Sequence, residues 1–458
     1  MRHGVPRGGG GLRPAALVGV LVALWLGVAA SVAVAHTELK RTSADARSVT
    51  LFFSKPASAR LTEVDVLAAT GGKVEPGPPR NAAGDPTTIT VPIRGALRSG
   101  RYFVMWSTAN DDGHVVSGAF DFRVSGSPAA GARRYRTYPA IPSSPAAVEG
   151  ALSLARIAQD AALTIAFGLV VFLRAVWRQV PAAARTGSPR DRGGTGAATA
   201  AVRSAVDPRL RTLLVAAAVV GAGTAAAAPL LQSAVLVRGV PWDGATWAAL
   251  PDVLALRAGA CWAVVALLWL GVVAAARRRP DGAIVVGLAA LLIVSPPLRG
   301  HAGDGPLGAA IVVHVAAAGA WIGGLVALLV VAHAAGVALS PRERLAHLAP
   351  VVSRFAVIAL PCAVAVLGTG ILQAIGSLDG LEQLTTESYG RLVAVKVALF
   401  TGIVAFAARG RRSLVARLWK PDGARAAAAM RTTIVMELML AGTALMAAAR
   451  LASTAPPG

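Results

Sequence analysis

Eight long apolar runs between residues 150 and 451 constrain the fold of this chain more than any other feature. Each is near or above the ~20 residues that a helix needs to cross the hydrocarbon core of a bilayer. The fourth run is the shortest and contains Pro296-Pro297. We therefore expect a polytopic all-α bundle of eight transmembrane helices near residues 150–175, 210–234, 254–276, 282–299, 307–335, 350–376, 390–409 and 431–451.

Composition and charge support a membrane protein and exclude a nucleic-acid partner. The chain is 55% hydrophobic and only 15% charged, which is too apolar for an ordinary soluble protein. Its net charge of +22 is spread through short segments between apolar runs, whereas a nucleic-acid binder would collect it on one face. Arginines fall in alternate loops, as the positive-inside rule requires. This pattern places residues 36–147 and the C-terminus outside the cytoplasmic membrane.

Residues 1–35 have the three parts of a secretory signal peptide. Arg2, Arg7 and Arg13 form a positive start, an apolar core follows, and Ala33-Val34-Ala35 is a small-x-small cleavage motif. The alternative is an uncleaved anchor helix, but the core is short for a span. Cleavage after Ala35 would make His36 the first residue of the mature protein.

Residues 36–125 have a different pattern, in which short runs alternate apolar and polar residues with a period of two. Val49, Leu51 and Phe53 share one face of the first clear run, and turn sequences such as Gly84-Asp85-Pro86 separate it from later ones. This spacing predicts an all-β, Ig-like (Greek-key) sandwich outside the membrane. Residues 126–147 are rich in Ser, Pro, Ala and Gly and read as a linker to the membrane domain at 148–458.

A metal site is expected in the sandwich. An N-terminal His36 would offer its amine and imidazole, His114 a third nitrogen and Asp112 an oxygen. Three nitrogens and one oxygen suit Cu(II). The alternative is that Asp112-Gly113 is only a turn with His114 at its edge. Met105 is the only methionine of the domain, so a thioether site for Cu(I) is not supported there.

Several polar residues fall within or beside the predicted spans. His301 precedes the fifth span, and His314 lies about seven residues into it, ~10 Å deeper. Trp321 is seven residues further, on nearly the same helical face. An ionisable group at that depth is a candidate for function, although a hydrogen bond to a neighbouring helix would also explain His314. Lys396 and Glu437 are also within spans and fit either a buried ion pair or a gate.

The remaining residues of this kind have simpler interpretations. We expect an interfacial or solvated role for His333 and His347, a local ion pair for Asp160 with Arg156, and buried packing for Cys261 and Cys362. Met439 and Met446 share a face of the last span, where we expect helix packing rather than Cu(I) binding.

The sequence resembles two copper-handling families. His36, Leu51-Phe52-Phe53-Ser54, Trp106 and Asp112-Gly113-His114 resemble the periplasmic copper-binding CopC family. The apolar part resembles the CopD copper permease family in the following motifs: Gly300-His301-Ala302, His314, Trp321-Ile322-Gly323-Gly324-Leu325, Arg354-Phe355, Thr386, Tyr389-Gly390, Lys396 and Glu437. The CopC resemblance implies Cu(II) ligands at His36, Asp112 and His114.

Two functions follow from this resemblance, and the combination of an N-terminal histidine with a second histidine, which also resembles the copper brace of lytic polysaccharide monooxygenases, suggests a third. The first is import, in which the sandwich takes Cu(II) from an extracytoplasmic donor and the membrane domain passes it to a cytoplasmic acceptor. The second is copper sequestration and resistance without net import. The third, a copper-brace monooxygenase, is disfavoured because Asp112 adds a charged ligand and no aromatic stripe for a glycan is visible. No nucleotide-binding motif is present. We expect a transport protein rather than an enzyme.

Overall fold

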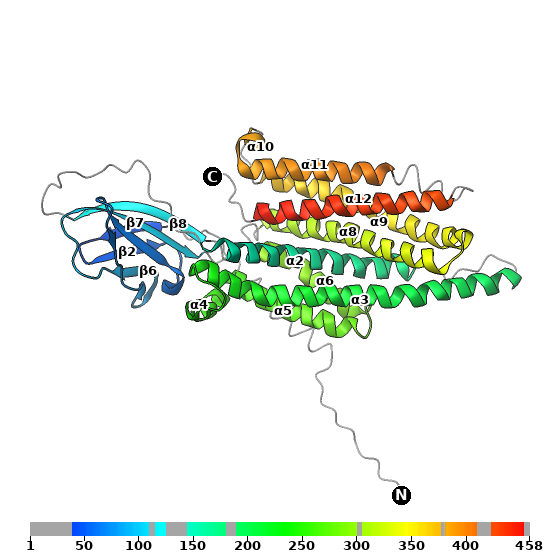
Figure 1. The fold of residues 1–458 in the computed structure, drawn as a ribbon, viewed down its shortest axis with the longest axis horizontal. Helices are drawn as coiled ribbons and strands as arrows, with labels where there is room; N and C mark the ends of the chain where they lie inside the picture. Colours follow the sequence, from blue (N-terminus) through cyan, green and yellow to red (C-terminus); the bar gives the residue numbers. More distant parts are fainter. Residues whose placement is uncertain are drawn as a thin grey trace, which may run out of the picture.

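The computed structural model describes residues 39–109, 115–124, 144–179, 189–299, 305–376, 380, 382–409 and 423–452. A β-sandwich is followed by a bundle of long helices that run side by side, and the sandwich sits at one end of them (Figure 1). We call this end of the bundle the outer end. The predicted fold class, a sandwich followed by a polytopic helical bundle, is confirmed.

The sandwich consists of two four-stranded antiparallel sheets. Its strands are β1 (Leu39–Ala44), β2 (Ser48–Phe53), β3 (Glu63–Ala68), β4 (Lys73–Val74), β5 (Arg80–Ala82), β6 (Asp85–Pro92), β7 (Gly100–Ala109) and β8 (Val115–Val124), with a 3-10 turn, η1, at Ala59–Leu61. One sheet has the order β1-β2-β6-β5 and the other β4-β3-β7-β8. Connections therefore cross between the sheets, as in an Ig-like Greek-key sandwich.

Alternation along the strands builds the core between the two sheets. Val49 and Leu51 are fully buried, while Thr50 between them is only partly covered. The Phe53 ring meets the Trp106 ring edge to face at 5.4 Å. A side chain at Gly118 would place its Cβ 2.8 Å from the Trp106 ring, so this cross-strand pair requires a glycine under the indole.

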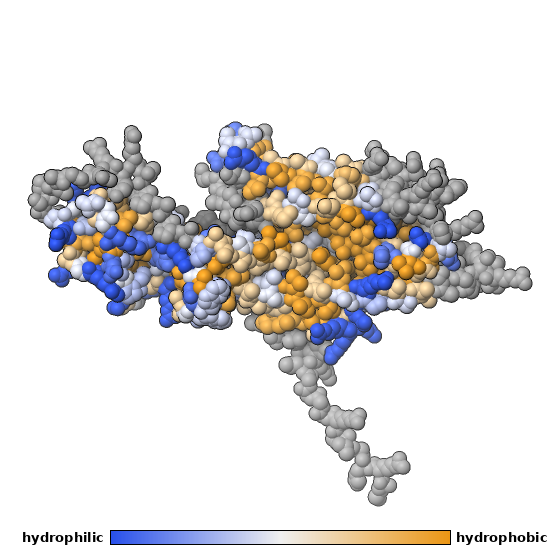
Figure 2. Space-filling model, in the orientation of Figure 1, coloured by the Kyte–Doolittle hydropathy of each residue, from blue (hydrophilic) through white to orange (hydrophobic). Residues whose placement is uncertain are grey.

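The helical part extends from residue 146 to 452. Its elements are α2 (Ala146–Phe172), the π-helical turn η2 (Leu173–Trp177), α3 (Pro189–Leu236), α4 (Gly244–Ala255), α5 (Arg257–Ala276), α6 (Ala283–Ile293), α7 (Ser295–Leu298), α8 (Gly305–Ala338), α9 (Pro341–Ile375), α10 (Gln383–Thr386), α11 (Ser388–Arg409) and α12 (Gly423–Ala452). Figure 2 shows a broad hydrophobic band over the middle of these helices, with hydrophilic residues towards both ends.

Seven of these helices are long and apolar enough to cross a membrane, one fewer than the eight predicted spans. The fourth predicted span, 282–299, forms the short apolar α6 and the single turn α7. Pro296 and Pro297 lack backbone N–H donors, which accounts for the interruption. The sequence analysis did not predict α4, a short helix at the outer end.

Glycines allow α2, α8 and α9 to approach closely. A Cβ at Gly323 of α8 would lie 2.5 Å from the Thr164 carbonyl oxygen and 2.8 Å from the Cα of Gly168, both on α2. A Cβ at the next residue, Gly324, would collide with the Phe355 ring of α9. The Gly323-Gly324 pair therefore brings two neighbouring helices against α8 at one level of the bundle.

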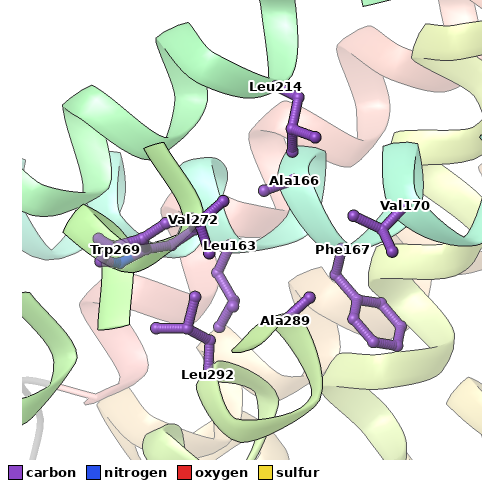
Figure 3. Close-up of a pocket in the computed structure, with 9 residues that line it drawn as sticks. All are labelled: Leu163, Ala166, Phe167, Val170, Leu214, Trp269, Val272, Ala289 and Leu292. Carbon is purple, nitrogen blue, oxygen red and sulfur yellow. The ribbon is translucent and has the colours of Figure 1, made fainter. Parts of the chain in front are cut away.

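One packing space among the first helices is lined by apolar side chains. Figure 3 shows it between α2, α3, α5 and α6, where Leu163, Trp269 and Leu292 are among the lining residues. None of the nine lining side chains is a His, Cys, Met, Asp or Glu, so this space offers no usual ligand for a metal ion.

Candidate metal centre and membrane path

The predicted sandwich ligands His36, Asp112 and His114 lie outside the described residues, but their neighbours in the chain are placed. Leu39, three residues after His36, pairs with Phe53. Phe53 contacts Trp106, and β7 then continues to Ala109, which pairs with Val115. The two segments that carry the predicted ligands thus attach to the same end of the sandwich. We call this end of the sandwich, which carries Leu39, Ala109 and Val115, the ligand end.

The ligand end contacts the membrane domain. Ala109 and Leu61 form a buried apolar cluster with Leu236 at the end of α3 and with Ala249 and Val253 of α4. In Figure 1, α4 lies between the sandwich and the long helices. The start of the segment that carries Asp112 and His114 is thus adjacent to the outer end of the bundle.

Arg238 adds polar contacts beside this cluster. Its Nη1 atom lies 2.6 Å from Oε2 of Glu63 and 3.4 Å from Oδ2 of Asp65, and its Nη2 donates to Oγ of Ser107 at 3.1 Å. All three acceptors belong to the sandwich. No pattern in the sequence predicts this contact, although Arg238 is a basic residue in an outer loop that is otherwise poor in Lys and Arg.

The backbone of Arg238 is left-handed, with φ at 52°. This residue ends α3 in a Schellman arrangement, in which Gly239 N–H donates to the Ala234 carbonyl and Arg238 N–H to the Val235 carbonyl. Glycine is usual at this position, and another residue there costs roughly 1–2 kcal/mol. Arg238 is therefore placed at a conformational cost.

His314 lies on α8, in the outer half of the bundle. Its Nδ1 atom is 3.0 Å from Oγ1 of Thr369 on α9. The Thr369 hydroxyl donates to the Ala365 carbonyl at 2.5 Å, so its oxygen accepts from His314. In the neutral imidazole this contact places the proton on Nδ1. The imidazole also forms a hydrogen bond with the backbone of Val366, so α9 contacts it through two groups.

Trp321 and Lys396 lie on α8 and α11, which are in contact beside the Phe400 ring. The Trp321 ring packs edge to face on the Phe400 ring of α11, with centroids 6.2 Å apart. Lys396, one turn before Phe400, is close enough to His314 for their charges to interact. Lys396 is thus near His314, whereas Trp321 lies two turns further along α8.

Glu437 is buried on α12, with 4% of its surface exposed. The sequence left an ion pair or a gate open for Lys396 and Glu437, and no ion pair joins them in the part of the chain that the structure describes. The structure brings Lys396 to His314 and leaves Glu437 as a separate buried carboxylate.

Family models account for most of the chain. They match the CopC domain at residues 36–125, the copper resistance protein D-like N-terminal domain at 147–309, and copper resistance protein D at 349–451. The chain is a CopC–CopD fusion. His314 and Trp321 of this fusion lie between the two CopD-type matches, whereas Lys396 and Glu437 lie within the second.

Solved structures similar to the CopC part include PcoC from Escherichia coli, described as a copper resistance protein. The match to one PcoC structure covers 19% of the fusion and 99% of the PcoC chain, with 22% sequence identity and a TM-score of 0.18. Another, described as methionine-rich, covers 20% and 100%, with 24% identity and a TM-score of 0.18. No curated protein matches the fusion.

The CopC–CopD fusion departs from several expectations for individual side chains. His347 is 8% exposed and packs edge to face on Trp177, so the predicted interfacial or solvated role is wrong, whereas His333 is exposed as predicted. Met439 and Met446 are 65% and 52% exposed, so they face away from the described bundle rather than pack in it.

Other expectations for the fusion concern ion pairs and metal clusters. Asp160 forms an ion pair at 3.6 Å with Arg299, which is far from it in the sequence. The charge of Arg156, one turn before Asp160, also acts on it. Cys261 is buried and Cys362 is half-buried. Within the described ranges, no group of three or more His, Cys, Asp or Glu side chains could hold a metal ion. His301 also lies outside these ranges.

Proposed function

We propose that this fusion captures Cu(II) outside the cell membrane with His36, Asp112 and His114 and delivers it to the CopD part for import. One observation carries the proposal: the ligand end of the sandwich is docked on the outer end of the bundle through Ala109 and Leu61. A sequestering domain has no need of this orientation, whereas a delivering domain does.

Within the membrane, we propose a path that starts at His301 and passes His314. With the proton on Nδ1, the Nε2 atom of His314 would offer a lone pair to a copper ion from a preceding ligand, because imidazole is a copper ligand. Trp321, Lys396 and Glu437 lie on helices around or below this position and line the further path. A donor outside and an acceptor in the cytoplasm complete the route.

The arrangement across the membrane is part of the proposal. Residues 1–35 are removed as a signal peptide, residues 126–147 link the two domains, and residues 148–458 form the membrane domain. The sandwich and the C-terminus then lie outside the cytoplasm, with the arginine-rich loops inside.

Copper resistance by sequestration is the second candidate, because the matched family descriptions name copper resistance. Deleting the gene separates the two. Import predicts that cellular copper falls in the deletion strain at limiting copper. Sequestration predicts unchanged uptake with greater sensitivity to high copper.

A further inference from the structure

The contact between sandwich and membrane domain contains one unusual residue, Arg238. A glycine there would end α3 without conformational cost. The arginine instead places a guanidinium against the sandwich, where its side chain is only 19% exposed. The arginine at this position therefore makes a contact between the domains, at the cost of a less favourable backbone conformation.

The acceptors of Arg238 are arranged to receive it. Glu63 and Asp65 are two residues apart on β3, so both side chains lie on the same face of the sheet. Ser107 of β7 lies directly opposite Glu63, and its hydroxyl oxygen accepts a hydrogen bond from the second guanidinium nitrogen of Arg238. Lys73 lies 3.1 Å from Asp65 and balances the second carboxylate.

The contact is partly shielded from water. Burial raises the pKa of the Glu63 carboxyl above its usual range, even though Arg238 beside it acts in the opposite direction. Charge interactions are stronger in such surroundings than at an open surface. By contrast, Arg60 and Asp252 are 3.6 Å apart at the edge of the same interface, and the Arg60 side chain is 68% exposed. The Asp252 side chain is 29% exposed, and Arg60 also donates to the Ala248 carbonyl at 3.3 Å. Because the Arg60 end is open to solvent, this pair is expected to contribute less than the Arg238 contact.

We propose that Arg238 is the positioning residue that docks the sandwich on the membrane domain, through Glu63, Asp65 and Ser107. The cluster of Leu61, Ala109, Leu236, Ala249 and Val253 supplies buried apolar area to this contact. Arg238 fixes the orientation of the sandwich on the membrane domain. The consequence for copper delivery rests on the proposed import function, whereas the docking role does not.

The test uses the full-length protein in lipid nanodiscs, with R238M and R238K compared against R94M. Methionine keeps most of the side-chain length and removes the charge. Lysine keeps the charge but lacks the planar guanidinium group, whose several N–H donors can bind two acceptors at once. Arg94 is matched because it also pairs with a glutamate, Glu75 at 3.9 Å, but its side chain is 72% exposed and lies outside this contact. Amide hydrogen exchange of residues 59–65 and 244–256, on the two sides of the contact, reports whether the sandwich is docked on the membrane domain. Copper titration reports the affinity of the sandwich site.

R238M should raise exchange on both sides of the contact by about tenfold, the loss expected for hydrogen bonds between charged groups. R238K should lie between R238M and wild type, and R94M should match wild type. Copper affinity should be unchanged in all three, and R238M should lower the maximal rate of copper uptake.

Unchanged exchange in R238M would overturn the docking role, even if uptake fell. Increased exchange with a wild-type uptake rate would overturn the role in delivery. If the wild-type protein transports no copper, the import proposal fails, and the exchange measurements alone then support or overturn the docking role of Arg238.

Discussion

Thr369 holds the imidazole of His314 across the contact between α9 and α8, with Oγ1 and Nδ1 3.0 Å apart. The proton of the threonine hydroxyl is already given to Ala365, so the imidazole can keep Nε2 unprotonated. This hydrogen bond fixes the orientation of the imidazole inside the bundle, as the proposed copper path requires.

His314→Ala should therefore lower copper uptake strongly, by about tenfold or more, while the sandwich binds copper as before. The matched control is His333→Ala, on the same helix but exposed near its other end. Thr369→Val, which keeps the shape and removes the hydroxyl, should lower uptake less, by roughly the value of one hydrogen bond. Normal uptake in the His314 variant would show that the residue only packs.

The mature protein should begin at His36, because the amine ligand exists only if the signal peptide is removed after Ala35. N-terminal sequencing of protein purified from membranes checks this directly. Any other first residue would remove the chelate formed by the amine and imidazole and with it most of the predicted site.

His114→Ala should weaken Cu(II) binding by the full-length protein by roughly 100-fold or more, since even an outer-shell partner of a metal ligand is worth 10- to 100-fold. Glu75→Gln is the control, because the Glu75 side chain is 81% exposed on the same domain. Titration followed by the visible absorption of Cu(II) measures both. Equal affinities in the two variants would remove His114 from the site.

Gly323→Ala should destabilise the bundle by about 1–3 kcal/mol, the usual cost of overpacking. The added methyl group would meet the Thr164 carbonyl and Gly168 on α2, both backbone obstacles. Gly287→Ala in α6 has no atom within 4 Å of the new Cβ and should be neutral or slightly stabilising. Thermal unfolding in detergent compares them, and equal midpoints would contradict the close packing of α2 on α8.

Asp45 should make the sandwich sensitive to acid. The backbone N–H groups of Arg47 and Ser48 bind its carboxylate and lower its pKa below the ordinary 3.8. Its stabilising effect is then complete above the ordinary value and is lost as the pH falls through the lowered one. Asp45→Asn should be less stable at neutral pH and lose less stability between pH 5 and pH 2, as measured by hydrogen exchange in β2; identical curves would contradict this role.

Local patterns in the sequence predicted most of the fold. Strand alternation at Val49 and Leu51, and the long apolar runs, are short-range signals that report burial directly. The interruption of the fourth run was visible as Pro296-Pro297. The site was predicted less completely, because contacts such as Arg238 with Glu63 or His314 with Thr369 join residues far apart in the chain, and no periodicity encodes such pairs.

Side-chain surroundings were the least predictable feature. His347 follows charged residues near the inner end of α9, yet it is buried against Trp177, which comes from a different part of the chain. Met439 and Met446 share a helical face as predicted, but that face is turned outward because no other described helix covers it.

Uptake of labelled copper tests import most directly. A strain that lacks the gene would receive the full chain, or a chain in which residues 36–125 are removed while the signal peptide is kept. We predict that the full chain restores uptake at limiting copper, and that removal of the sandwich lowers the rate and raises the copper concentration needed for half-maximal uptake. Equal uptake with the full chain and with no gene would contradict import by this fusion.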